Sequence, residues 1–117
     1  MEITYDKYDA NVYQSDAART INPELTRDEM AQHATLGMVS EIGEICGIYQ
    51  KTFQGHEPDP EHAKRELGDL LWFVAEYCTA QGWKLSDVMR LNISKLRARY
   101  PQGFDPERSR HRAQGDV

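Results

Sequence analysis

The stretch SEIGEICGIYQ, residues 40–50, places two acids one helical turn apart inside an apolar run. The stretch ELGD, residues 66–69, repeats this arrangement farther along the chain. An α-helix turns about 100° per residue, so in each stretch both acids lie along the margin of one apolar stripe. The two patterns predict two helices that pack stripe to stripe, with four carboxylates converging at the edge of their interface. These acids are Glu41, Glu44, Glu66 and Asp69.

The apolar stripes have the spacing of buried helix faces. We expect the first to pack against the second through Ala34, Met38, Ile42, Ile45 and Tyr49 on one side and Leu67, Leu70, Leu71, Val74 and Cys78 on the other. The capping residues, glycines and prolines between the apolar segments predict four helices in all and no strand. The expected helices cover residues 6–19, 26–53, 60–80 and 86–100, and the last 13 residues form a polar, loosely held tail. The sequence therefore predicts an all-α fold.

Three sequence signals define the helix ends. Thr26 followed by Glu29 is a capping box, and Asp59 followed by Pro60 is a cap with proline at the first helical position. Gly82 ends the third helix. Short caps of this kind predict where each helix begins and ends.

Charge and composition exclude several classes of function. The chain has 117 residues and a net charge of −5, and residues 1–59 carry 4 Lys+Arg against 11 Asp+Glu. A net acidic chain argues against general nucleic-acid binding, and no apolar run approaches the roughly 20 residues that cross a membrane. The N-terminus is too polar for a signal peptide. At 117 residues, the chain is expected to form one domain. Cys46 and Cys78 are expected to be reduced core thiols, which favours a cytoplasmic protein.

Four converging carboxylates repel one another at neutral pH unless a cation separates them. Oxygen ligands favour a hard ion, so we expect Mg²⁺, with Mn²⁺ as a substitute, rather than zinc. One such pair of acids is usually a solvated helix face, but two pairs with the same offset from two apolar stripes favour a metal site.

The expected fourth helix carries the complementary charge. Asn92, Lys95 and Arg99 share one face, spaced three and four residues apart. Donors of this kind beside a metal site suit a polyphosphate. The alternative is a solvated basic helix end, which the helix dipole also favours.

Three further residues can be interpreted either as functional residues or as ordinary packed or surface residues. His33 lies two turns before Glu41 and either lines a pocket for a nucleobase or is a packed or surface residue. Lys51, at the end of the second helix, either reaches a phosphate or complements the helix dipole. Glu76, two turns after Asp69, is either an outer ligand or a surface charge.

Taken together, these motifs resemble a known family. The pattern Glu41-x-x-Glu44, 21 residues, then Glu66-x-x-Asp69 is similar to the signature of the MazG-type all-α nucleoside triphosphate pyrophosphohydrolases. The segment NISKLRARYP, residues 92–101, resembles the last helix of this family, and YQSDAART, residues 13–20, resembles its first helix.

The resemblance implies a four-helix MazG-like bundle over residues 1–104, followed by a polar tail over 105–117, in a chain that assembles as a homodimer or homotetramer. It implies a Mg²⁺-dependent hydrolase that cleaves a nucleoside triphosphate to the monophosphate and pyrophosphate. In this reading the four acids are both the metal ligands and the catalytic residues. The expected substrate-binding residues are Asn92, Lys95, Arg99, Lys51 and His33.

Two alternatives remain open at this point. A related pyrophosphohydrolase with another substrate, such as phosphoribosyl-ATP, would carry the same acids. A catalytically silent module of the same fold, which binds nucleotides or regulates another protein, would keep the helices without the activity. These motifs do not indicate which base or sugar the substrate carries.

Overall fold

The computed structural model describes residues 9–117, and all five of the elements it contains are helices. They are α1 (Ala10–Ala18), α2 (Arg27–Thr52), α3 (Pro60–Gln81), α4 (Leu85–Arg99) and α5 (Pro106–Arg110). The predicted all-α class is therefore confirmed over this range. The expected start of the first helix, near residue 6, lies outside the described residues. The chain divides into two compact units, one ending at Lys84 and one beginning at Leu85.

The helix ends follow from local capping chemistry. At the start of α2, the side chain of Thr26 accepts from the Glu29 N–H at 3.1 Å, and the Glu29 carboxylate accepts from the Thr26 N–H at 2.9 Å. The Asp59 side chain accepts from the His62 N–H at 3.1 Å ahead of Pro60. Gly82 ends α3 with φ at 74°, a left-handed conformation that glycine adopts without steric cost.

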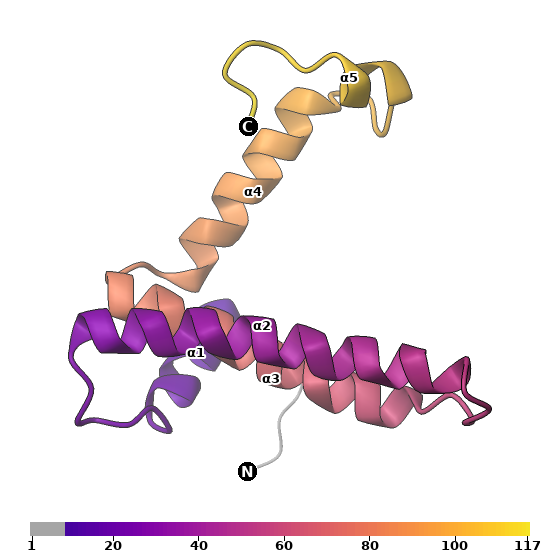
Figure 1. The fold of residues 1–117 in the computed structure, drawn as a ribbon. Coiled ribbons are helices and arrows are strands. Elements are labelled where there is room, and N and C mark those ends of the chain that lie inside the picture. The colour runs from indigo at the N-terminus through magenta and orange to yellow at the C-terminus, as the bar shows by residue number, and fades with distance from the viewer. Residues whose placement is uncertain (1–8) are drawn as a thin grey trace. The chain divides into compact units, whose positions relative to one another are not determined.

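Helices α2 and α3 lie side by side along their length (Figure 1). Gly37 is buried on α2, and a Cβ atom at this position would overlap the Phe73 ring of α3. Ala34 and Ala75 are fully buried on the two helices. Small side chains thus let the two backbones approach closely, with Phe73 filling the space above the glycine.

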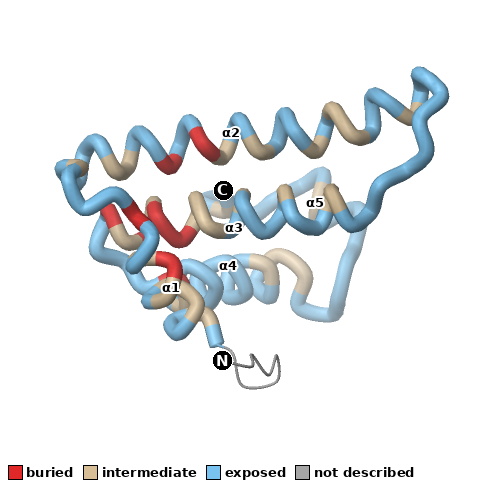
Figure 2. Tube along the Cα trace, turned by 90° about the horizontal axis from the view of Figure 1, so that it is seen from below, coloured by how far each residue is buried: buried red, intermediate tan, exposed pale blue. Residues whose placement is uncertain are grey.

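The interface of α2 and α3 is buried at one end only (Figure 2). The buried residues of α2 lie in its first half, while those of α3 lie in its second half. The expectation that both stripes are wholly buried is wrong at the other end, where Ile42 is 50 % exposed and Tyr49 65 %. Cys46 is exposed and Cys78 buried, so only one cysteine is a core thiol.

Helix α1 packs on α3 within the same unit. The Gln14 amide donates to the Trp83 carbonyl at 2.8 Å, and the Trp72 indole N–H donates to Thr20 Oγ1 at 2.7 Å. Ala17 of α1 is buried. These contacts hold α1 and the turn that follows it against α3 and the turn that follows α3.

The second unit contains α4, α5 and the C-terminal tail. The expectation of a loosely held tail is wrong. Asp105 caps α5, where its side chain accepts from the Glu107 N–H at 3.0 Å, and Asp116 forms an ion pair with Arg99 of α4. A long-range ion pair of this kind depends on tertiary structure, which local composition does not predict.

None of the described helices combines the length and the apolar character needed to cross a membrane.

Candidate metal and catalytic site

Three of the four predicted acids come together in the first unit. Glu41 of α2 and Glu66 and Asp69 of α3 each offer a carboxylate oxygen, and these oxygens all lie within 4.8 Å of one another. Glu44, one turn farther along α2, is exposed and stands outside this group. Its charge still acts on Glu41. We call Glu41, Glu66 and Asp69 the acid cluster.

Proton sharing dominates the electrostatics of the acid cluster. A side-chain hydrogen bond with Glu66 raises the pKa of Glu41 to about 7, and burial and the negative charges of Glu66, Asp69 and Glu44 act in the same direction. Two carboxyl groups can share a hydrogen bond only when one of them keeps a proton. The cluster therefore holds a proton near neutral pH that an isolated glutamate would have lost.

A second observation shows that the cluster fits a cation. Oxygen Oε2 of Glu41 is buried and has no hydrogen-bond partner. A buried acceptor without a partner is costly, and a bound cation would satisfy it while also removing the repulsion between the acids. The donors are all carboxylate oxygens, which suits Mg²⁺ or Mn²⁺ better than zinc.

Two residues beside the cluster were not anticipated from the sequence. His62 Nε2 lies 3.0 Å from Glu66 Oε1, one helical turn away on α3. Burial and then the charge of Asp69 raise the pKa of Tyr13, which places this α1 side chain within electrostatic reach of the cluster. The spacing of His62 and Glu66 was a readable signal for the first contact. Nothing local in the sequence indicates the second.

His33 and Glu76 form a second polar pair across α2 and α3. Glu76 is fully buried, so the reading of a surface charge is wrong. His33 Nδ1 lies 2.8 Å from Oε1 and 3.0 Å from Oε2 of this carboxylate. Both oxygens within hydrogen-bond reach of one ring nitrogen indicate that the imidazole N–H donates to the carboxylate. The sequence placed both residues on the acid side of their helices but did not predict that they pair.

An aromatic group surrounds this pair. The His33 ring meets Phe73 at a centroid distance of 5.6 Å and Trp72 at 6.4 Å, both edge to face. Trp72 and Phe73 are 5.0 Å apart. The His33 side chain stays 52 % exposed, so one edge of its ring remains accessible while the other is fixed by Glu76.

The remaining predicted substrate residues lie on exposed surfaces or in the second unit. Lys51 is exposed in the last turn of α2. Asn92 and Lys95 are exposed on α4. Arg99, on the same face, is bound by Asp116 from the tail, and this hydrogen-bonded pairing raises the pKa of its guanidinium.

Comparison with known proteins gives two matches. The family model of the MazG nucleotide pyrophosphohydrolase domain matches residues 30–104, which include the acid cluster, Glu44 and the predicted donors of α4. The Gene 37 protein of Mycobacterium phage L5 is 30 % identical over 80 residues, which cover 64 % of this chain and 70 % of the phage protein. No solved structure matches the chain significantly. The α1 helix and the tail beyond residue 104 lie outside the family match.

Proposed function

Because the chain belongs to the MazG nucleotide pyrophosphohydrolase domain family, we propose that it hydrolyses a nucleoside triphosphate to the monophosphate and pyrophosphate. The family supports a pyrophosphohydrolase type of enzyme. The observation that supports this chemistry best is the acid cluster, in which three carboxylates from two helices meet around a buried oxygen without a partner. We also propose a role in clearing unwanted nucleotides or in adjusting the nucleotide pool.

We propose that the acid cluster holds Mg²⁺, with Mn²⁺ able to substitute, and that Glu44 completes the set of ligands. A bound divalent ion would lower the pKa of a water molecule and neutralise phosphate charge. Glu66 and Asp69, one turn apart on α3, would fix one side of the ion site, and Glu41 of α2 the other. The tight pairing of α2 and α3 at Gly37 sets the spacing of these two sides.

We propose Glu41 as the acid that takes the proton from the attacking water. In the metal-free cluster, the hydrogen bond with Glu66 raises the pKa of Glu41 to about 7. A bound divalent ion would lower this pKa, so Glu41 would be ionised and would accept the proton through an oxygen that does not bind the ion.

The substrate would be held outside the acid cluster. We propose that Asn92 and Lys95 bind the sugar and phosphate groups, as their shared face on α4 suggests, with Lys51 a further cation for the phosphates. His33, oriented by Glu76 and flanked by Trp72, offers a hydrogen-bonding edge to a nucleobase. The Nε–Nη2 edge of Arg99 can bind a phosphate only after it leaves Asp116.

We further propose a cytoplasmic homo-oligomer. Both cysteines are free thiols. The exposed apolar residues of α2 favour a second copy of the chain as their cover.

The test is pyrophosphate release across a panel of nucleotides with Mg²⁺. The panel contains the canonical ribo- and deoxynucleoside triphosphates, modified nucleotides and phosphoribosyl-ATP. We expect release with at least one triphosphate, loss of that release with EDTA, and recovery with Mg²⁺ or Mn²⁺. Release from phosphoribosyl-ATP alone would replace the proposed substrate. Binding of nucleotides without release would identify a silent module.

A further inference from the structure

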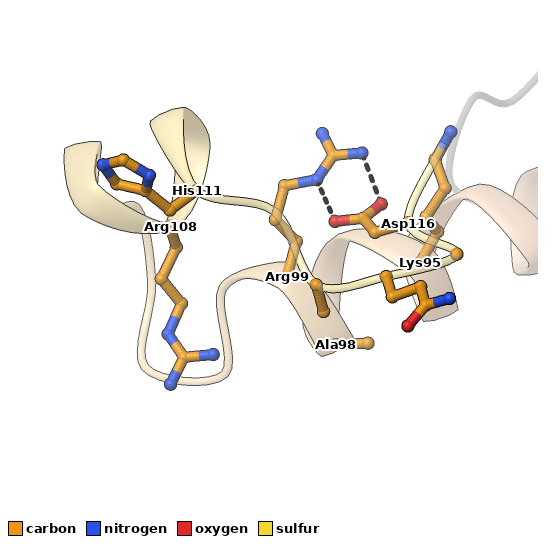
Figure 3. A pocket seen from close by; sticks show the side chains of 9 residues that line it. Lys95, Ala98, Arg99, Arg108, His111 and Asp116 are labelled. Carbon is orange, nitrogen blue, oxygen red and sulfur yellow. Dashed lines mark hydrogen bonds and ion pairs between the residues drawn. The ribbon is translucent and has the colours of Figure 1, made fainter.

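The second unit contains a pocket that is lined by two of the predicted substrate residues, Lys95 and Arg99, and by the C-terminal tail. It has a volume of about 310 Å³ and lies between α4 and the C-terminal tail. Its charged lining residues are Lys95 and Arg99 from α4 and Arg108 and Asp116 from the tail, and His111 also lines it (Figure 3). The tail residues lie beyond residue 104, where the family match ends. The pocket is therefore built partly from an element outside the family domain.

Asp116 and Arg99 form a two-pronged ion pair in this pocket. The Arg99 Nε–H donates to Asp116 Oδ2 at 2.8 Å, and Nη2–H donates to Oδ1 at 2.7 Å. The two side chains are only 9 % and 13 % exposed. Figure 3 shows the carboxylate facing the guanidinium, with both bonds side by side. A phosphate group presents a pair of oxygens with the same spacing to arginine, so Asp116 occupies the position that a phosphate would take.

The lining of the pocket carries more positive than negative charge. Lys95, Arg99 and Arg108 are cationic at neutral pH, and Asp116 is the acid among the lining residues. The pKa of Asp116 is lowered by its hydrogen bonds with Arg99 and further by the charges of Arg99, Arg112 and Lys95. The Asp116 carboxylate thus lies within electrostatic reach of three cations, Arg99, Arg112 and Lys95. A phosphate group, with more negative charge and a third oxygen for Lys95, would be matched better by the same surroundings.

We propose that this pocket is a binding site for phosphate groups and that Asp116 is its internal competitor, a latch that holds Arg99 until a phosphate-bearing ligand displaces it. The inference rests on the proposed function in one respect, since a nucleoside triphosphate or its pyrophosphate product supplies that ligand. Release of the latch frees Arg99 and leaves Lys95 beside it on α4. Arg108 points away from the ion pair and is not needed for the exchange (Figure 3).

The test measures binding of sodium tripolyphosphate to the full chain by calorimetry, in EDTA and at one fixed ionic strength. Without metal the acid cluster repels the anion, and the difference in affinity between the wild type and Asp116→Asn reports on the pocket of the second unit. Asp116→Asn should bind the anion about tenfold more tightly than the wild type, because a charge-assisted competitor has been weakened. Glu107→Gln is the matched control. It removes one charge from the same tail at an exposed residue that pairs with Arg110 and His111 and not with Arg99.

Two further variants keep the test decisive. Removal of residues 114–117 should give the same gain as Asp116→Asn, and Arg99→Gln in the Asp116→Asn background should remove it. Circular dichroism checks that the helices persist. If Asp116→Asn binds no more tightly than the wild type, or if Glu107→Gln gains as much, the latch is wrong.

A second arm separates the latch from the proposed function. The KM for the hydrolysed nucleotide is measured with Mg²⁺ in the wild type and in Asp116→Asn. A lower KM assigns the site to the substrate, whereas an unchanged KM together with tighter inhibition by pyrophosphate assigns it to the product. If no nucleotide is hydrolysed while the metal-free gain persists, the proposed function fails and the latch stands. If hydrolysis occurs without that gain, the latch fails and the function stands.

Discussion

At the scale of single residues, the proton between Glu41 and Glu66 couples the acid cluster to pH. A cation and a proton compete for the same carboxylates, so binding of Mg²⁺ must release the proton wherever the cluster still holds it. With the pKa of Glu41 at about 7, this competition falls within the physiological range. Metal affinity should therefore increase as the pH rises through 7.

The same pKa predicts how the stability of the metal-free protein depends on pH. The pKa of Glu41 rises from 4.5 to about 7 on folding, so between these values the folded chain binds more protons than the unfolded chain. Glu41 makes its full contribution to the free energy of unfolding below about pH 4.5, and this contribution is lost as the pH rises through 7. In EDTA, we expect the melting temperature to decrease as the pH is raised from 5 to 8.

Variants isolate the contribution of Glu41 from that of other titrating groups. Glu41→Gln should lose most of the pH dependence in thermal melts, while Glu57→Gln, in the exposed loop before α3, should keep it. Equal pH dependence in Glu41→Gln and the wild type would show that proton sharing with Glu66 does not control the cluster.

We expect the charges of the acids to be needed for turnover rather than for folding. Asp69→Asn and Glu44→Gln should each lower turnover by more than about tenfold, because each removes a carboxylate from the proposed ion site. The metal-free fold should persist or gain slightly, since each change reduces repulsion. Glu61→Gln, an exposed acid in the first turn of α3, is the control. Near-normal turnover in Glu44→Gln alone would restrict the site to the acid cluster.

At the scale of elements, the close approach of α2 and α3 depends on Gly37. Gly37→Ala places a methyl group into the Phe73 ring and should lower the free energy of unfolding by about 2 kcal/mol through overpacking. Gly47→Ala is the matched control on the same helix, with no atom within 4 Å of the added Cβ. It should stabilise the chain by up to about 1 kcal/mol through helix propensity. Urea unfolding of both variants measures the difference, and equal effects would contradict the close packing.

The elements also show which features of the fold and the site could be predicted from the sequence. The ends of α2 and α3 were predictable because Thr26, Asp59 and Gly82 act through neighbours within a few residues. The grouping of Glu41, Glu66 and Asp69 was predictable because helical periodicity places acids three residues apart on one margin of a helix, whereas Glu44 lies outside the acid cluster. The burial of Glu76 was not, because it depends on His33, 43 residues away. The ion pair of Arg99 with Asp116 was not predictable for the same reason. Helix α5 was missed although Asp105 and Pro106 form the same local cap signal as Asp59 and Pro60.

At the scale of the whole molecule, the exposed apolar residues predict an assembly of identical chains. Val39, Ile42, Cys46 and Tyr49 on α2 and Phe53 at its C-cap recur every three or four residues, and all are exposed. A continuous apolar stripe of this length is typical of a protein interface. The mass in solution, measured by light scattering, should therefore be a multiple of the chain mass of 13.5 kDa.

A pair of valines tests this assembly. Val39→Glu should reduce the mass toward that of one chain, because it buries a charge in the proposed interface. Val12→Glu, an equally drastic change at an exposed valine of α1, should leave the mass unchanged. A single-chain mass for the wild type, together with full activity, would exclude the oligomer.

The uneven burial of α2 and α3 also implies that the two ends of this helix pair fluctuate differently. Backbone amides near Ala34 and Ala75 are shielded from solvent and should exchange their hydrogen for deuterium slowly, whereas those around the acid cluster should exchange faster through local opening. A cation that joins Glu41 to Glu66 and Asp69 would tie the two helices together at their open end. Slower deuterium uptake there, followed by mass spectrometry, would then report that the site is occupied before any nucleotide is turned over.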